Sequence, residues 1–354
     1  MNLSTTYLGI PLRTPFVPSA SPLTQNPDNV KRLEDAGAAA VIFHSLFEEQ
    51  VQAERYERFK YFTEGTESYP EALTYTPHPV EFKVGPDLYV EHIARAKSQV
   101  QIPVIASLNG STPGGWTNYA KQLQQAGADA IELNLYSIPT DFELSAHDIE
   151  HTYLQVLRDI KALVTIPVAV KLGPFFTNFG RMAKCLEGAG ASGLVLFNRF
   201  YQPDIDTETL EVKPNILLST PMAMRLPLTW IGLLSGRVNV SLAASSGIHR
   251  ATDAAKMLLV GADVTMLCSV LLRRGISHLQ VLEKELLEWM ERHEYESVEQ
   301  LKGSLSQIKC PDPSAFERAL YLHALATTSE SYTRSALRKA RKSEEVVPYS
   351  PSFL

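Results

Sequence analysis

Residues 128–140 read ADAIELNLYSIPT, and this stretch decides how the rest of the chain is interpreted. An alanine–glycine–alanine turn leads into a short apolar run in which Glu132 and Asn134 stand two residues apart. Alternate residues of a strand point to the same face, so these two polar side chains share one side. An unpaired buried amide or carboxylate costs about 1–3 kcal/mol or more. The pattern therefore indicates either a surface strand or a buried strand whose inner face lines a site.

The same alternation of strand and helix recurs along the chain. Strand-like runs are centred near residues 16, 41, 105, 132, 169, 195, 240 and 265, most of them separated by a helical pattern of ten or more residues. The turns AGA at 36–38, 126–128 and 189–191 and GAD at 261–263 fit a helix C-cap glycine followed by a tight turn. Eight alternating units favour a closed parallel (β/α)8 TIM barrel over an open doubly wound sheet. The predicted strands are Pro15–Ala20, Ala39–His44, Pro103–Leu108, Ala130–Leu135, Pro167–Leu172, Ser192–Asn198, Val238–Ala243 and Asp263–Leu267.

Caps and apolar stripes place the helices between these strands. Asn26 with Pro27 predicts one helix start, and Ser145 with Asp148 resembles a capping box that opens a helix to about Val164. We expect a barrel over residues 1–308, with the insertion 48–86 after the second strand as a helical start followed by a loop over the site. Residues 309–354 are expected to form a C-terminal helical extension and tail, with a helix over Pro313–Ala326 and a basic stretch at Leu337–Lys342.

Composition narrows the function classes. A net charge of −6 without a basic stripe disfavours nucleic acid as a partner. Three widely spaced cysteines without a CxxC motif indicate reduced thiols in a cytoplasmic protein, and neither a zinc nor an iron–sulfur site nor any other metal site is expected. The N-terminus lacks a secretory pattern and no run approaches about 18 apolar residues, so secretion and membrane spanning are disfavoured.

Polar residues gather at the carboxyl ends of the predicted strands, where TIM barrels carry their chemistry. Lys171 is the sharpest of them, because it ends the apolar strand VAVKL. It could extend to solvent, steady an anionic cofactor or intermediate, or form a Schiff base as a desolvated amine. His44 is read either as a ligand-binding residue or as a packed core histidine. The strand-end set is Ser19, Ser21, His44, Ser45, Ser107, Asn109, Asn134, Ser137, Lys171, Asn198, Arg199, Ser245 to Gly247, Cys268 and Ser269.

The loops after the seventh and eighth strands stand where barrels often bind phosphate. There, backbone amides and a helix N-terminus present donors to an anion. The seventh loop reads SSGI, with Gly247 permitting close backbone approach, and the eighth reads Cys268-Ser269. A plain turn is the alternative reading of each loop.

These residues match a known pattern. Over about residues 1–305 the chain resembles the dihydroorotate dehydrogenase family, above all its soluble class 1 branch, which is an FMN-binding (β/α)8 barrel that oxidises a dihydropyrimidine. PFVPSAS resembles the first strand with its flavin contact at Ser19 and Ala20, and ELNL and VKLGPFF resemble the signatures of strands four and five. The resemblance implies that Asn134 touches flavin and substrate, and that Lys171 stabilises the anionic reduced flavin near its N1–C2 edge.

The other family positions follow in the same way. Asn198, with Arg199 beside it, stands where the family has a substrate-binding asparagine. SSGIH and CSVL stand where the family has its phosphate-binding glycines, which implies that FMN phosphate is held by the amides of Ser246, Gly247, Cys268 and Ser269. His44 and Ser45 are assigned to the flavin-binding set by their place at the end of the second strand.

The chain also departs from the family pattern. His44 replaces the second-strand lysine, and residues 63–80 occupy the region of the NSMGLPN-type substrate loop. Counted from Asn134, Ser137 takes the position of the catalytic base, as serine does in class 2 enzymes. Counted back from Pro139, Ile138 takes that position and no base remains. The asparagine expected after the proline is Thr140, which puts orotate chemistry itself in question.

The leading hypothesis is a cytoplasmic FMN-dependent oxidoreductase that passes hydride between a dihydropyrimidine-like small molecule, not necessarily dihydroorotate, and flavin N5. Lys171 would compensate charge, Asn134 and Asn198 would orient the substrate, and Ser137 or Tyr136 would handle the proton. One alternative is a Schiff-base aldolase that uses Lys171 on a phosphorylated substrate; another is a catalytically decayed flavin-binding protein. The electron acceptor stays open, and the family resemblance suggests a homodimer.

Overall fold

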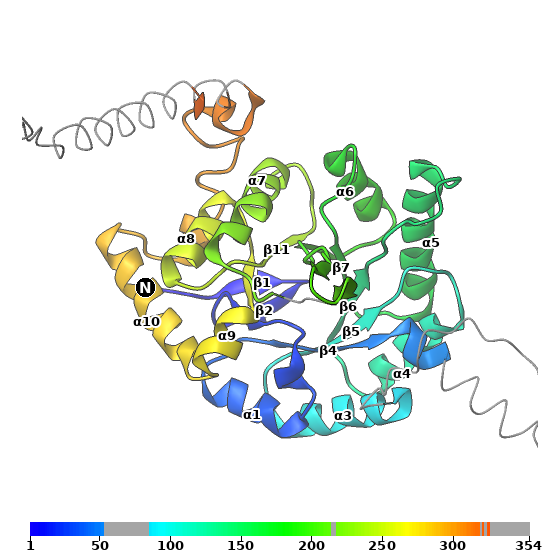
Figure 1. Cartoon of the computed structure of the whole chain (residues 1–354). Helices are drawn as coiled ribbons and strands as arrows, with labels where there is room; N and C mark the ends of the chain where they lie inside the picture. Colours follow the sequence, from blue (N-terminus) through cyan, green and yellow to red (C-terminus); the bar gives the residue numbers. More distant parts are fainter. Residues whose placement is uncertain (53–84, 214–216, 319–320, 322–323, 326–354) are drawn as a thin grey trace, which may run out of the picture.

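Eight parallel strands form a nearly closed barrel in the computed structural model, which describes residues 1–52, 85–213, 217–318, 321, 324 and 325. Neighbouring strands pair in the order β3-β12-β11-β8-β7-β6-β5-β4. Ala39, just before β4, donates its N–H to the Phe16 carbonyl of β3 at 3.1 Å and so bridges the two ends of that order. The predicted (β/α)8 barrel is confirmed (Figure 1). The strands are β3 (Phe16–Pro18), β4 (Val41–Phe47), β5 (Val104–Asn109), β6 (Ala130–Leu135), β7 (Val168–Leu172), β8 (Gly193–Leu196), β11 (Ser241–Ser245) and β12 (Val264–Leu267).

Helices surround the strands on the outside of the barrel (Figure 1). The Asn26 side chain caps the first of them by accepting from Asp28 N–H, and Ser145 and Asp148 form the predicted capping box of α5. The helices are α1 (Pro27–Asp35), α3 (Pro86–Gln99), α4 (Tyr119–Gln125), α5 (Ala146–Leu163), α6 (Phe179–Gly188), α7 (Arg225–Leu234), α8 (Ala251–Val260), α9 (Ser269–Arg274), α10 (His278–Arg292) and α11 (Val298–Leu301), with short 3-10 turns η1 (Pro22–Thr24), η2 (Gly115–Asn118), η3 (Pro221–Met224) and η4 (Pro313–Phe316). None of the helices in these described ranges is both long and apolar enough to cross a membrane.

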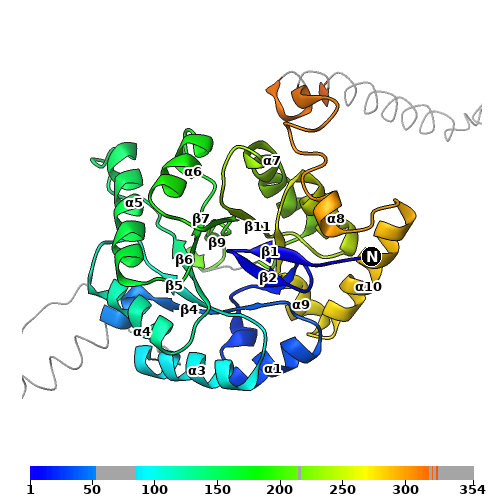
Figure 2. The ribbon, with the colours of Figure 1, turned by 180° about the vertical axis from the view of Figure 1, so that it is seen from behind.

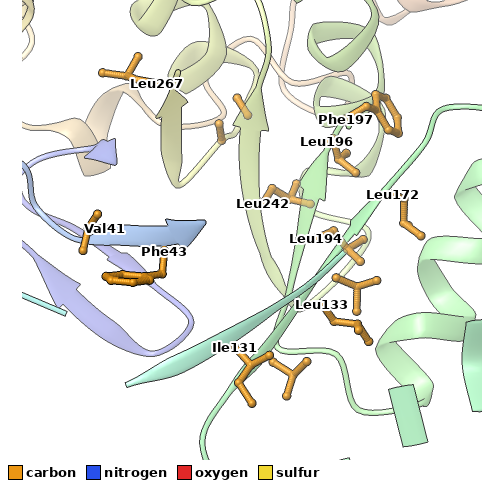
Figure 3. Close-up of a cluster of buried hydrophobic side chains, with 14 of the residues drawn as sticks. Val41, Phe43, Ile131, Leu133, Leu172, Leu194, Leu196, Phe197, Leu242 and Leu267 are labelled. Carbon is orange, nitrogen blue, oxygen red and sulfur yellow. The ribbon is translucent and has the colours of Figure 1, made fainter. Parts of the chain in front are cut away.

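Alternation along β6 decides which side chains enter the barrel. Ile131 and Leu133 point outward into the apolar layer between strands and helices, which Figure 3 shows with Leu172, Leu194 and Leu242. The inward positions carry a second apolar cluster that includes Ala130. Glu132 and Asn134 follow Ala130 at the same spacing of two and therefore share its inward face. Both are buried, so the strand is of the buried kind.

A hairpin that the sequence analysis did not anticipate closes the barrel at the amino ends of its strands. It pairs β1 (Thr5–Tyr7) with β2 (Ile10–Leu12) and crosses that end of the barrel in Figure 2. Leu8 donates its N–H to Ser241 Oγ at 3.0 Å, and its side chain lies where a Cβ on Gly193 would collide with it. Apolar side chains of the hairpin, including Tyr7, complete the inner cluster.

Two strands depart clearly from their predicted bounds, and one additional hairpin is present. The seventh barrel strand, β11, begins at Ser241 rather than Val238, because Val238 still donates to Leu234 O at the end of α7. β4 continues past His44 to Phe47, with a register shift between Ile42 and Ser45. The excursion after β8 contains a small hairpin, β9 (Asp204–Asp206) with β10 (Glu211–Lys213).

The insertion and the C-terminal extension are only partly described. Residues 48–52 are helical, as predicted for the start of the insertion, whereas the rest of the expected loop, including 63–80, lies outside the described residues up to 84. In the extension, Phe316 packs on α7 at Gly232, and residues 318, 321, 324 and 325 are helical. The predicted start of this helix at Pro313 is wrong, because Pro313–Phe316 forms only the 3-10 turn η4 and the backbone of Glu317 is extended. The remaining residues of the predicted helix, the basic stretch and the tail lie outside the described residues.

Candidate active site

Polar side chains of four adjacent strands meet inside the carboxyl end of the barrel. Ser45 Oγ of β4 lies 2.9 Å from Ser107 Oγ of β5, and Ser107 is in register with Glu132 of β6. Glu132 Oε1 lies 3.3 Å from the Nζ of Lys171 on β7. These two contacts join β4 to β5 and β6 to β7, and the register of β5 and β6 sets the two pairs side by side as one polar group.

Lys171 lies within this group rather than extending freely into solvent. Only 7% of it is exposed, and its Glu132 partner is completely buried. Burial raises the pKa of the Cys268 thiol, and the positive charge of Lys171 partly offsets that rise. Cys268 follows β12 on the other side of the barrel, so the lysine charge reaches across the interior.

Asn134 and Asn198 form an amide pair beside the lysine. Asn134 is in register with Lys171, and its Oδ1 accepts from Asn198 Nδ2 at 3.0 Å. The contact uses one donor and one acceptor, and it leaves a donor on one amide and an acceptor on the other. This remains true whichever way the two amides are oriented.

Ser219 organises a second cluster, formed by the loops after β8, β11 and β12. Its Oγ accepts from Gly247 N–H at 3.3 Å, and its own N–H donates to Ser269 Oγ at 3.0 Å. Arg273 donates to the Ser219 carbonyl at 3.0 Å and to the Leu218 carbonyl at 3.3 Å. Ser219 thus joins the two loops predicted to bind phosphate, with a guanidinium beside them. Ser219 is not among the predicted site residues, and its one signal in the sequence is its place two residues before Pro221, at the start of a helical stretch.

The backbone at Ser246 and Gly247 adopts the left-handed conformation expected of a loop that approaches a ligand closely. Both residues have positive φ, of +77° and +79°. A Cβ on Gly247 would lie 2.4 Å from Met224 N, so no side chain fits without a shift of that backbone. Ser246 Oγ donates to the Phe197 carbonyl at 3.3 Å, which ties this loop to the end of β8.

His44 packs away from the cluster. Its ring lies 4.9 Å from the ring of Tyr89 on α3, and its Nδ1 lies 3.2 Å from the Thr24 carbonyl. The register shift before Ser45 permits this, and the Tyr89 hydroxyl bonds the Ser107 backbone on the neighbouring strand. Burial lowers the pKa of His44 to about 4, so the ring is neutral at pH 7. The flavin contact assigned to His44 stays a prediction that this packing does not support.

Ser137 lies at the edge of a separate cavity. Its Oγ lies 2.6 Å from the Tyr153 hydroxyl of α5, and burial raises the pKa of Tyr153, so this partner is protonated at neutral pH. Ile138, the residue of the competing register, exposes 43% of its surface. The cavity holds about 160 Å³ and is lined by Leu135, Tyr136, Ser137, Pro139, Ala146, Ile149, Glu150, Tyr153, Gly173, Phe175, Phe176, Thr177 and Phe200.

The remaining predicted site residues lie at the rim. Ser19 is buried and donates its N–H to Leu267 O at 2.8 Å, and Ala20 packs against the inner cluster. Arg199 donates to the Leu217 carbonyl, next to the Ser219 cluster. Tyr136 accepts from Tyr201 N–H at 2.8 Å through its hydroxyl.

The donor set fits a flavin mononucleotide. A buried ammonium and an amide pair suit the polar edge of a heterocycle, while the Gly247 loop, Ser269 and Arg273 suit a phosphate. Within the described residues, no group of three or more His, Cys, Asp or Glu side chains could hold a metal ion. The arrangement can therefore bind an anionic cofactor and place a small heterocycle beside Lys171.

Comparison with known proteins gives one consistent family. The family model described as dihydroorotate dehydrogenase matches residues 83–290. The chain is 27% identical over 310 residues to the catalytic subunit of dihydroorotate dehydrogenase B (NAD(+)) of Thermoplasma volcanium, covering 85% of this chain and 98% of that protein. It is 23% identical over 331 residues to the chloroplastic dihydropyrimidine dehydrogenase (NADP(+)) of Arabidopsis thaliana, covering 85% and 76%.

Proposed function

This chain belongs to the dihydroorotate dehydrogenase family, and from that membership we propose that it uses FMN to oxidise or reduce the CH–CH bond of a dihydropyrimidine-like substrate. That it is an oxidoreductase of this type follows from the family and from the relatives that cover most of its length. The cofactor, the substrate and the residue roles below are the proposal. Its main support is the placement of Lys171 and the Asn134–Asn198 pair on adjacent strands.

Residues of two clusters would hold the cofactor. The Gly247 and Ser269 loops, joined through Ser219 and flanked by Arg273, would bind the phosphate. Lys171 would lie at the polar edge of the ring system, and Ser45 and Ser107 add hydroxyls on the neighbouring strands. The chemistry that bound FMN would supply is acceptance of a hydride from a substrate carbon.

The amide pair accounts for the substrate class. After their mutual hydrogen bond, one residue of the Asn134–Asn198 pair keeps its whole NH2 group and the other keeps its whole carbonyl oxygen for further bonds. A lactam edge of a dihydropyrimidine offers the complementary acceptor and donor side by side, so it could bond both asparagines at once. The two amides would therefore orient the ring.

Ser137 would handle the proton in this scheme. Its partner Tyr153 stays protonated at neutral pH and so cannot serve as a base. A serine hydroxyl whose described partner is a neutral phenol is a very weak base, so Ser137 would pass the substrate proton on to solvent as it gives up its own, rather than store it.

The aldolase hypothesis fits the geometry less well. A Schiff-base lysine must lose its proton to attack a carbonyl, whereas the Lys171 ammonium lies 3.3 Å from a fully buried carboxylate. Lys171 is therefore paired with a carboxylate and is not the isolated, desolvated amine that the aldolase hypothesis requires.

The test is a visible absorption spectrum of the purified protein, reconstituted with FMN if needed, followed by anaerobic addition of dihydroorotate and of dihydrouracil. We expect flavin absorbance that one of these compounds bleaches. Lys171→Ala should slow the bleaching, while Lys302→Ala, at the opposite end of the barrel, should not. Protein that binds no FMN would refute the proposal. Bound FMN that no dihydropyrimidine reduces faster than free flavin would instead favour the decayed flavin-binding protein.

A further inference from the structure

Glu132 is a buried charge that the proposed function leaves without a role. It lies on the inward face of β6 between Ala130 and Asn134, and no part of it is exposed. Its Oε1 contacts Lys171, whereas its Oε2 has no hydrogen-bond partner within the described part of the chain. A fully buried carboxylate oxygen without a partner is rare and calls for an explanation.

A second buried polar atom lies below it in the barrel. The hydroxyl of Tyr7, on the hairpin that closes the amino end, is also without a partner among the described residues. Burial raises the pKa of Tyr7, and the Glu132 charge raises it further, so the two groups are within electrostatic reach. Buried polar atoms of this kind are commonly joined by an internal water.

The contact with Glu132 can hold the Lys171 ammonium in place and still leave N–H donors of that ammonium for a ligand. At 3.3 Å it is longer than the 2.7–2.9 Å typical of a charge-assisted hydrogen bond. An ammonium has three donors, so most of its hydrogen-bonding capacity is left for a ligand. The carboxylate below also compensates the cost of burying the ammonium.

The other titratable groups near the Glu132–Lys171 pair do not supply a negative charge in place of this carboxylate. Burial raises the pKa of the Cys268 thiol and of the Tyr7 and Tyr89 hydroxyls, so all three are neutral at pH 7. The negative charge that faces Lys171 from β6 is therefore that of Glu132.

We propose that Glu132 is a positioning residue that holds the Lys171 ammonium in place at the ends of the strands, and that a buried water links its second oxygen to Tyr7. The hairpin at the floor of the barrel then supports the site at the top. The role of Lys171 toward a cofactor rests on the proposed function, whereas the pairing itself does not.

The first test is a double-mutant cycle on the protein without added flavin. Glu132→Gln, Lys171→Met and the double variant are unfolded in urea. Removing one member of a buried pair leaves the other charge uncompensated, whereas removing both does not. We expect the double variant to lose less than half the summed midpoint loss of the two single variants. Additive losses would overturn the pairing.

The second test separates positioning from mere structural support. The folded protein is treated with acetic anhydride between pH 6 and 9, and acetylation of each lysine is followed by mass spectrometry. Without Glu132 the Lys171 amine loses the partner that holds it in place, so we expect Lys171 to react at least tenfold faster at pH 8 in Glu132→Gln than in the unmutated protein. Glu132→Asp should give a smaller increase in the Lys171 rate, and it replaces Glu132→Gln in this test if that variant does not fold.

Asp263→Asn is the matched control, because Asp263 pairs with Lys302 at 3.1 Å at the opposite end of the barrel. Asp263→Asn should raise the acetylation rate of Lys302 and leave that of Lys171 unchanged. Equal Lys171 rates in Glu132→Gln and the unmutated protein would overturn the proposal, and so would a parallel rise at Lys302, which indicates general loosening. Neither readout requires bound FMN, so failure of the proposed function would be seen separately.

Discussion

Gly247 is the position where one added methyl group tests the proposed phosphate site most directly. Its φ is +79°, and a Cβ there would lie 2.4 Å from Met224 N and 2.9 Å from Met224 Cβ. Gly9, in the turn of the N-terminal hairpin, has the same φ of +79°, and no other described atom lies within 4 Å of its Cβ position. Gly9→Ala is therefore a matched control that shares the backbone strain but lacks the collision.

The two costs can be separated. A left-handed backbone costs an L-residue about 1–2 kcal/mol, and this applies to both variants. Gly247→Ala must also displace the Met224 backbone, and overpacking of this kind costs about 1–3 kcal/mol more. We therefore expect Gly9→Ala to lower the free energy of unfolding by about 1–2 kcal/mol, and Gly247→Ala by about 2–5 kcal/mol.

Equilibrium urea unfolding measures the difference in stability between the two variants, and quenching of flavin fluorescence measures their affinity for FMN. Because Met224 closely follows Ser219, a shift there disturbs the contacts that join the phosphate loops, so Gly247→Ala should weaken FMN binding at least about tenfold, the equivalent of 1.4 kcal/mol. Gly9→Ala should bind FMN normally. Equal stability losses would show that the loop is not packed against Met224. Unchanged FMN affinity in Gly247→Ala would refute the phosphate assignment.

Three further perturbations test other parts of the site. Ser137→Ala should slow substrate-dependent flavin reduction by about 10²–10⁴-fold in stopped-flow measurements, with Tyr153→Phe slower by less, and an unchanged rate in Ser137→Ala would exclude the proton role. Because the pKa of His44 is about 4 when folded and its ordinary value is 6.5, the unfolded chain binds that proton first. Protonation of His44 in the unfolded chain should therefore lower the free energy of unfolding by up to about 3 kcal/mol as the pH falls from 6.5 to 4. His44→Gln should flatten this pH dependence in urea unfolding. Arg273→Ala should weaken FMN binding by about 1 kcal/mol through the released Leu218 and Ser219 carbonyls, and an equal loss in Arg274→Ala would contradict this.

Much of the framework was predictable because its signals are local. The spacing of two between Glu132 and Asn134 assigns them to one face whatever the rest of the chain does. The Asn26 and Ser145 caps and the recurrent AGA turns depend on only a few adjacent residues, and the structure has the caps where they were expected. The family resemblance rests on the same short motifs.

Other features depend on contacts that no local pattern encodes. The register shift in β4 turns His44 toward Tyr89, although a simple alternation gives no reason for it. Ser219 joins Gly247 and Ser269 only because three loops meet at one end of the barrel. The hairpin at the floor was missed because its strands are three residues each, too short for a periodic signal.

The sequence by itself determined the number and order of the barrel strands and the face that Glu132 and Asn134 share, since both follow from periodicity and from turns within a few residues. Only the tertiary structure decided which of those polar residues become partners. Glu132 and Lys171 are 39 residues apart, and their contact exists because barrel closure sets neighbouring strands side by side in one particular register.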